Sequence, residues 1–206
     1  MKEETYNFWS KLSPTLDHMT LRTNTKQFDQ QEQKEIMSYL PDLSGHHVLE
    51  LASGIGRFTG HLAHQASHVT SVDFAPQLIE TNRMTHKHHT NITYKVADVM
   101  DLSFESASFD TVFINWLFIY LSDQNTQLLF ERIHNWLKPG GTFFFRESTH
   151  ATGRSNFGKY TAIYRRIEEY IDLISKYFTL KNHDIVLTYF LQCKLTNQHY
   201  WLCQKD

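Results

Sequence analysis

Three acidic residues and a short glycine loop are spaced as a nucleoside-binding site requires. The loop 52–56, Ala-Ser-Gly-Ile-Gly, follows the apolar run 47–51, which contains Glu50. Asp73 closes the next apolar run, and Asp98 follows the one after it. Glycine between a strand and a helix lets backbone and ligand approach closely, and an acid ending the next strand can accept hydrogen bonds from both ribose hydroxyls. Without these acids, the glycines would also suit a turn that only needs positive φ.

Two nucleoside ligands compete for this pattern, a dinucleotide and S-adenosylmethionine. The dinucleotide pattern needs a third glycine where this chain has Thr59, and Glu50 lies inside the strand before the loop. A pyrophosphate needs free backbone N–H groups and tolerates a nearby anion poorly, whereas an acid can help to hold the amino group of S-adenosylmethionine through bound water. Glu50 therefore favours S-adenosylmethionine as cofactor.

Alternating strands and helices must position these residues. Apolar periodicity predicts helices at 28–40, 58–66, 76–84 and 125–137, and strands at 47–51, 69–73, 92–96, 111–114 and 142–145. The tail changes character, with strands expected at 178–180, 185–191 and 200–203 and a hairpin formed by the last two. Such alternation indicates an α/β fold with a mostly parallel sheet, in which the acids share the carboxyl edge where ligands bind.

The composition argues against several other classes of protein. The chain has 206 residues, enough for one domain, and its formal net charge of -2 gives no basic surface for nucleic acid. Cys193 and Cys203 lack metal-ligand spacing, and the histidine-rich stretch 86–89 is predicted to be a solvated loop, so no metal is expected. Without a signal segment or a run of about 18 apolar residues, we expect a cytoplasmic protein with no membrane span.

Several stretches resemble the first methyltransferase half of plant-type phosphoethanolamine N-methyltransferases. They are VLELASGIGRFTG at 48–60, Asp73-Phe74, Ala97-Asp98-Val99, Asn115-Trp116-Leu117, Tyr120-Leu121-Ser122-Asp123, Trp136-Leu137-Lys138 and Phe144-Phe145-Arg146-Glu147-Ser148. The likeness runs over nearly the whole chain. It implies a single Rossmann-like class I methyltransferase domain at 1–206, with a seven-stranded sheet, helices on both faces and an antiparallel C-terminal hairpin. Residues 1–40 would form a helical cap, and 146–175 a lid over the acceptor site.

The resemblance also implies which residues bind the cofactor. These are Thr23, Glu50, Ala52, Ser53, Gly54, Gly56, Asp73, Phe74, Asp98, Val99, Asn115 and Trp116. The chain departs from the family at three positions. Ala52 replaces a glycine and should fit if its φ stays negative, Phe8 replaces a tyrosine, and Gly158 replaces an arginine.

An amine acceptor must lose a proton before its lone pair can attack the methyl group, since the pKa of a free amine is about 10. We predict that Tyr120, after the fourth strand, accepts this proton; the alternative is an interior tyrosine with a satisfied hydroxyl. Arg146 is the favoured ligand of an acceptor phosphate, among candidates that include Arg154, Lys159, Arg165 and Arg166. For Arg165 and Arg166, a solvated helix face paired with Glu168 and Glu169 is the alternative.

Aromatic rings complete the expected acceptor site, since Trp9, Trp116 and Tyr160 could contact a methylated ammonium, or could belong to the core. Phosphoethanolamine is the favoured acceptor. Another small amine, hydroxyl or carboxylate, or a cofactor-binding subunit without turnover, remain the other hypotheses.

Overall fold

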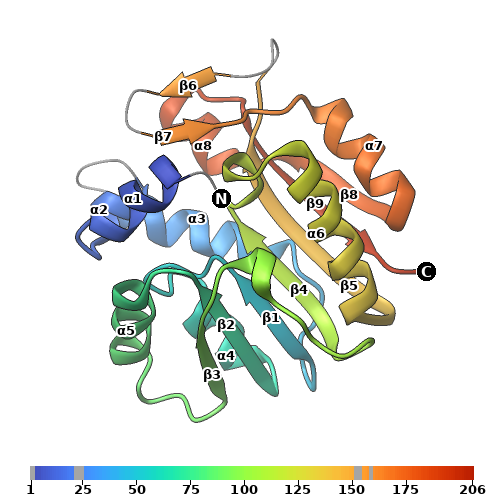
Figure 1. Ribbon diagram of the computed structural model, residues 1–206, viewed down its shortest axis with the longest axis horizontal. Coiled ribbons are helices and arrows are strands. Elements are labelled where there is room, and N and C mark those ends of the chain that lie inside the picture. The colour runs from blue at the N-terminus through green and yellow to red at the C-terminus, as the bar shows by residue number, and fades with distance from the viewer. Residues whose placement is uncertain (1–2, 21–25, 151–154, 158–159) are drawn as a thin grey trace.

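The computed structural model describes residues 3–20, 26–150, 155–157 and 160–206, and the side chains of 4–19, 26–150 and 162–206. A seven-stranded sheet with the order β3-β2-β1-β4-β5-β9-β8 runs through the molecule (Figure 1). The strands are β1 (His47–Leu51), β2 (His68–Asp73), β3 (Ile92–Val96), β4 (Phe109–Asn115), β5 (Leu137–Ser148), β8 (Thr179–Ile185) and β9 (Gln198–Gln204). Strands β1 to β5 pair in parallel, and β9 is antiparallel to both β5 and β8.

Helices cover both faces of this sheet, which confirms the predicted fold class. They are α3 (Lys26–Ser38), α4 (Thr59–Gln65), α5 (Pro76–Thr85), α6 (Asp123–Trp136), α7 (Ile167–Tyr177) and α8 (Leu187–Cys193). Successive strand residues point to opposite faces, so Phe143 and Phe145 pack with α6 and α7, while Phe144 packs with α3, α4 and α8. The sheet thus separates two apolar cores.

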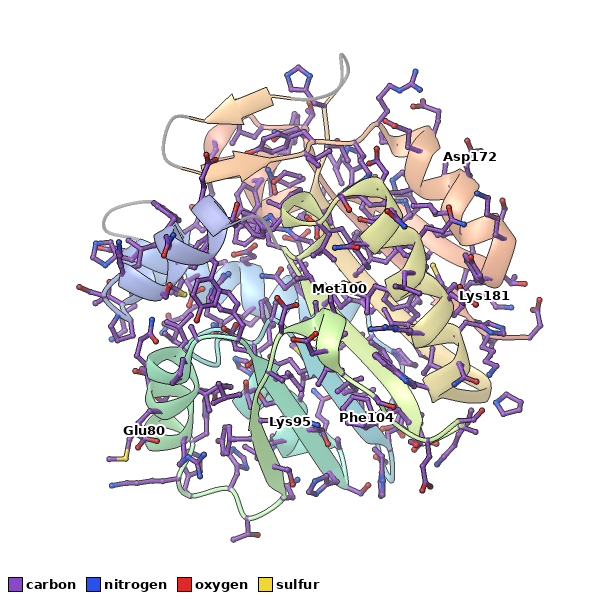
Figure 2. The ribbon with its side chains drawn as sticks, viewed as in Figure 1. Glu80, Lys95, Met100, Phe104, Asp172 and Lys181 are labelled. Carbon is purple, nitrogen blue, oxygen red and sulfur yellow. The ribbon has the colours of Figure 1, made fainter. Side chains whose placement is uncertain are left out.

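An aromatic cluster borders the core on the α6 side, at the start of β4 and the end of α6. Phe104 packs edge-on against Phe109 and Trp136, with ring centroids 5.0 and 5.2 Å apart. The ammonium of Lys95 lies 5.1 Å from the centre of the Phe104 ring (Figure 2). Phe109 and Trp136 are buried in this core, and Phe104 packs against it, so the cluster extends the apolar core between β4 and α6.

The C-terminal region contains the main error of the sequence-based prediction. Residues 185–191 were expected to be a strand, but α8 begins at Leu187, and the antiparallel pair forms between β8 and β9 instead. A short apolar run cannot be assigned to strand or helix by periodicity alone. Tertiary contacts decide, because Val186 and Tyr189 are buried in the α3 core as one turn of helix places them.

Shorter elements gather near the carboxyl edge of the sheet: α1 (Glu3–Lys11), α2 (Leu16–Thr20), the 3-10 turns η1 (Val99–Asp101) and η2 (Phe118–Tyr120), and a two-stranded sheet of β6 (Ser155–Phe157) and β7 (Tyr160–Ala162). Gln77 of α5 donates to the carbonyl of Ser10 at 2.7 Å, which ties α1 to the parallel part of the sheet. Among the described helices, no segment combines the length and apolar character that crossing a bilayer requires.

Candidate active site

One pocket lies where β1, β2 and β4 end, and most of the predicted site residues line it. Those that do are Trp9, Glu50, Ala52, Ser53, Gly54, Asp73, Phe74, Asp98, Val99, Asn115, Trp116 and Tyr120. Gly56, the last residue of the loop 52–56, is not among the lining residues. Several further lining residues were not predicted as site residues. Met19 of α2 and Leu78 of α5 gave no recognisable signal in the sequence, whereas Arg57 and Phe58 belong to the stretch 48–60 that resembles the family.

The glycine loop adopts left-handed conformations at three positions. Gly54 and Gly56 have φ of 55° and 88°, and a Cβ at Gly56 would lie 2.1 Å from Oδ1 of Asn82. Nε2 of His86 donates to the carbonyl of Gly56 over 2.8 Å. The first residue of the stretch 86–89 therefore packs behind the loop, and the prediction of a wholly solvated loop is wrong for His86. Among the described residues no group of His, Cys, Asp and Glu could hold a metal ion.

Ala52 also has a positive φ, of 56°, so the condition under which alanine fits without strain, a negative φ, is not met. A left-handed residue with a Cβ carries a cost of about 1–2 kcal/mol, whereas glycine costs about 0.4–1 kcal/mol more than alanine through the unfolded chain. The family's glycine at this position therefore has a steric reason, and this chain accepts some strain beside the pocket.

We expect Ala52→Gly to raise the free energy of unfolding by about 0.5–1 kcal/mol in denaturant titrations. Ala107 is a matched control, since it has the same φ of 56° but is exposed and outside the pocket. Ala107→Gly should stabilise by a similar amount, and only Ala52→Gly should alter cofactor affinity. A destabilised Ala52→Gly protein would contradict the assignment of strain to this residue.

Glu50 belongs to a buried polar network beneath the loop. Its Oε2 accepts from the hydroxyls of Thr59 at 2.5 Å and Ser71 at 3.1 Å, and the amide of Asn82 donates to both of these hydroxyls. Burial raises the pKa of Glu50 to about 8, although the two hydroxyls lower it. The residue expected to be glycine in a dinucleotide site, Thr59, thus positions the acid.

Asp73 and Asp98 hold backbone segments on either side of the pocket. The Asp73 carboxylate accepts from the N–H groups of Gly54 at 2.9 Å and Ala75 at 3.0 Å. Burial raises the pKa of Asp73 to about 6, against the lowering effect of these bonds. Asp98 caps η1 by accepting from the N–H of Met100 at 2.9 Å. Each carboxylate retains lone pairs that can accept hydrogen bonds from a ligand.

Asn115, Trp116 and Tyr120 line the pocket at the end of β4. Oδ1 of Asn115 is buried without a hydrogen-bond partner in the described part of the chain, which leaves this acceptor available to a bound ligand. Trp116 has a φ of 60°, and its indole N–H lies 3.2 Å from the hydroxyl of Ser148. The Tyr120 ring meets Trp9 of α1 edge-on at 5.6 Å. A strained, well-supported residue next to a pocket is common at functional sites.

The structure does not bring Arg146 to the pocket, which corrects its expected role as a phosphate ligand. Its side chain is 0% exposed, and its guanidinium lies 2.8 Å from Glu32 in an ion pair that lacks the alignment of a hydrogen bond. The guanidinium carbon stacks 3.5 Å from the centre of the Trp116 ring. Arg57 is also paired with Glu32 and with Asp29. These two acids and two arginines form a buried ion cluster between α3, the loop and β5.

The remaining predicted site residues differ in their exposure and in whether the structure describes them. Arg166 is exposed and paired with Glu169, as the solvated-face alternative expected. Arg165 is buried and binds main-chain carbonyls, so neither expectation for it was right. Thr23, Arg154 and Lys159, and the side chain of Tyr160, lie outside the described residues.

Comparison with known proteins supplies the class. A family model described as "Methyltransferase domain" matches residues 48–141. Phosphoethanolamine N-methyltransferase of Triticum aestivum is 37% identical over 99% of this chain and 44% of that protein, and the Caenorhabditis elegans enzyme of that name is 38% identical over 72% of this chain and 32% of its own. The solved structure of Haemonchus contortus phosphoethanolamine N-methyltransferase 1, in complex with phosphoethanolamine and S-adenosylhomocysteine, has a TM-score of 0.88 and 30% identity over 98% of this chain and 48% of that one.

The chain belongs to the class I S-adenosylmethionine-dependent methyltransferases. Within that class, the chain is similar over most of its length to phosphoethanolamine N-methyltransferases, the family that its sequence motifs resemble. It spans less than half the length of these relatives.

Proposed function

We propose that this chain transfers a methyl group from S-adenosylmethionine to the amine of phosphoethanolamine. The observation that carries the proposal is the likeness over 98% of the chain to a solved protein holding phosphoethanolamine and S-adenosylhomocysteine. Because the chain spans less than half of that protein, its activity and acceptor must be tested on the chain itself. A cytoplasmic location and a small-molecule acceptor are part of the proposal, and the net charge of -2 gives no basic surface for nucleic acid as the acceptor.

The residues of the pocket fit the cofactor. Asp73, already anchored to the loop by two N–H groups, would accept from the ribose hydroxyls, while Phe74 and Val99 would contact the adenine. Glu50 would attract the amino group of the methionine part, and the unpartnered Oδ1 of Asn115 would meet the reacting end. When bound, the cofactor supplies a methyl group on a sulfonium sulfur, and the acceptor's lone pair displaces that sulfur from the methyl carbon in line. The chain then mainly has to align the acceptor, exclude water and remove one proton.

The acceptor enters as an ammonium and must lose its proton before attack. Desolvation in an apolar pocket lowers an amine pKa, and a hydroxyl at its edge can pass the proton on, directly or through water. Tyr120 is the candidate because it lines the pocket beside Asn115 and its ring is fixed against Trp9. Its role as proton acceptor stays a prediction.

We expect Tyr120→Phe to lower kcat about 10²- to 10⁴-fold, the range of general acid–base contributions, while the Kd for S-adenosylmethionine changes little. Transfer of labelled methyl measures the rate of turnover, and calorimetry measures the Kd for S-adenosylmethionine. Tyr177→Phe, outside the pocket, is the control and should leave both values unchanged. An unaltered rate in Tyr120→Phe would remove this hydroxyl from the mechanism.

The second acceptor class is another small amine, a hydroxyl or a carboxylate, and one observation favours it. Among the lining residues that the structure describes, Arg57 is the only cation, and its charge is already balanced by two acids. A phosphate in this pocket therefore needs a cation from elsewhere, such as Arg154 or Lys159 of the predicted lid 146–175. The last part of that segment, α7, packs in the core, so any lid ends before Ile167.

An acceptor panel distinguishes the alternatives. Labelled S-adenosylmethionine is incubated with the chain and with phosphoethanolamine, ethanolamine or phosphatidylethanolamine. Transfer to phosphoethanolamine alone supports the proposal. Transfer only to another amine establishes the second class, and cofactor binding without any transfer contradicts the proposal.

A further inference from the structure

Two buried charges of opposite sign lie at the two ends of the turn 117–121, which connects β4 with α6. Glu147, near the end of β5, is 0% exposed, and Arg165, just before α7, is 3% exposed. Neither lines the pocket. The sequence suggested Arg165 as a phosphate ligand and gave Glu147 no role. The turn between them carries Tyr120.

Glu147 holds the beginning of the turn. Its Oε1 accepts from the N–H groups of Leu117 and Phe118, both at 2.6 Å. These amides follow Trp116, whose left-handed φ of 60° turns the chain away from β4. Hydrogen bonds from backbone N–H groups to a carboxylate are short and strong, so Glu147 supports a backbone conformation that would otherwise be strained.

Arg165 holds the end of the same turn. Its guanidinium donates to the carbonyl of Phe118 at 2.7 Å and to that of Leu121 at 2.8 Å, and it pairs with Asp123 at 2.9 Å. A further backbone bond runs from the N–H of Ile163 to the carbonyl of Ile119 at 2.7 Å. Buried carbonyls without partners would be costly, and the guanidinium fork satisfies two of them at once.

We propose that Glu147 and Arg165 are a pair of positioning residues that clamp the turn 117–121 from both ends and thereby fix Asn115 and Tyr120 at the reacting end of the pocket. The structural part depends only on the bonds described, and the catalytic part rests on the proposed function. Phe118 is bound by both members, through its N–H to Glu147 and its carbonyl to Arg165. Loss of either charge should therefore loosen the same segment.

The charge of Glu147 is poised to change near neutral pH. Burial raises its pKa to about 7, while the N–H groups of Leu117 and Phe118, then Arg146 and Arg165, lower it. Its Oε2 has no hydrogen-bond partner in the described part of the chain. The other ionisable groups around it are Tyr170 of α7, whose own pKa is raised by burial and by Glu147, and His199, its neighbour on β9. Below pH of about 7 the carboxylate protonates, so its hydrogen bonds from the N–H groups of Leu117 and Phe118 weaken and the turn loosens.

The test compares Glu147→Gln, Arg165→Met and the double variant with a matched control, Arg166→Met, which removes the neighbouring exposed arginine. Hydrogen exchange of the amides in 117–121 is measured in the cofactor-free protein. We expect exchange to quicken about tenfold or more in both single variants and to stay unchanged in the control. Exchange in the double variant should be little faster than in the single variant that exchanges faster, because both substitutions act on one segment.

Kinetics separate positioning from general damage. With phosphoethanolamine, kcat should fall about tenfold or more in both variants while the Kd for S-adenosylmethionine changes less than about threefold. The acid limb that Glu147 gives the wild-type kcat profile, near pH 7, should be absent from Glu147→Gln. Arg165→Lys keeps one donor group and should recover part of the rate; it also serves if Arg165→Met does not fold.

Unchanged exchange in 117–121 for both Glu147→Gln and an Arg165 variant would overturn the clamp. So would a loss of cofactor affinity as large as the loss of kcat, which would indicate general damage. If the wild type methylates no acceptor, the proposed function fails, but hydrogen exchange still decides whether the two charges hold the turn.

Discussion

Replacing Glu32 with alanine should lower the free energy of unfolding by about 3–5 kcal/mol, the cost of breaking a buried ion pair. Glu32 is fully buried and balances both Arg57 and Arg146. Burial alone would raise its pKa, but the two arginines outweigh it and hold the pKa below 4.5. Its removal leaves Arg146 with no acidic partner among the described residues.

Chemical denaturation with Lys34→Ala as control measures this effect, since Lys34 is exposed on the same helix. Because the folded pKa of Glu32 is depressed, its contribution is complete above pH of about 4.5 and disappears as pH falls through the folded value. The difference between wild type and Glu32→Ala should therefore shrink in acid. A loss below about 1 kcal/mol at pH 7 would mean that water reaches the cluster.

Asp73→Asn should weaken S-adenosylmethionine binding about 100-fold or more. The carboxylate binds the loop through Gly54 and would accept two ribose hydroxyls, and each hydrogen bond to a charged group contributes about 1.5–3 kcal/mol. An amide nitrogen cannot accept from the N–H of Gly54 or from a hydroxyl. Calorimetric titration measures the change, and Asp101→Asn, an exposed acid of η1, should bind like wild type.

The same residue predicts a pH dependence of binding. The pKa of Asp73 is raised to about 6 without ligand, so the acceptor carboxylate is lost as pH falls through this value. Affinity should drop below pH of about 6 in the wild type, and this step should be absent from Asp73→Asn. For stability the sign is opposite: the raised pKa favours the protonated native state, so this contribution declines as pH rises from about 3.8 to about 6. A wild-type Kd that is flat across pH 6 would contradict the assigned role of Asp73.

The parallel half of the fold was predictable because its strands are short segments rich in apolar and β-branched residues, each beside a recognisable turn. The strand predicted at 92–96 coincides with β3, and β2 and β4 extend their predictions by one to a few residues. The segment 185–191 was not predictable, since its apolar residues fit a strand or a helix equally well until α3 is packed against it.

The cofactor side of the site could also be predicted, whereas the charges around it could not. Glu50, Asp73 and Asp98 end neighbouring parallel strands, and topology alone brings them to one edge. Arg146 and Arg165 were predicted as candidate ligands of an acceptor phosphate because they belong to a group of cations that follows the strand at 142–145. Only packing shows that α3 supplies an acid to one, and that the carbonyls of η2 surround the other.

By itself, the sequence determined the class of fold, the cofactor and the acids that line the pocket, because these depend on local periodicity and on strand ends that meet in any parallel sheet. Tertiary structure decided which charges are buried, that Ala52 is strained, and how the turn with Tyr120 is held. Those features depend on contacts between segments far apart in the chain, such as Glu32 with Arg146 or Glu147 with Phe118. No local pattern records such contacts, since burial sets their strength and only the assembled core provides it.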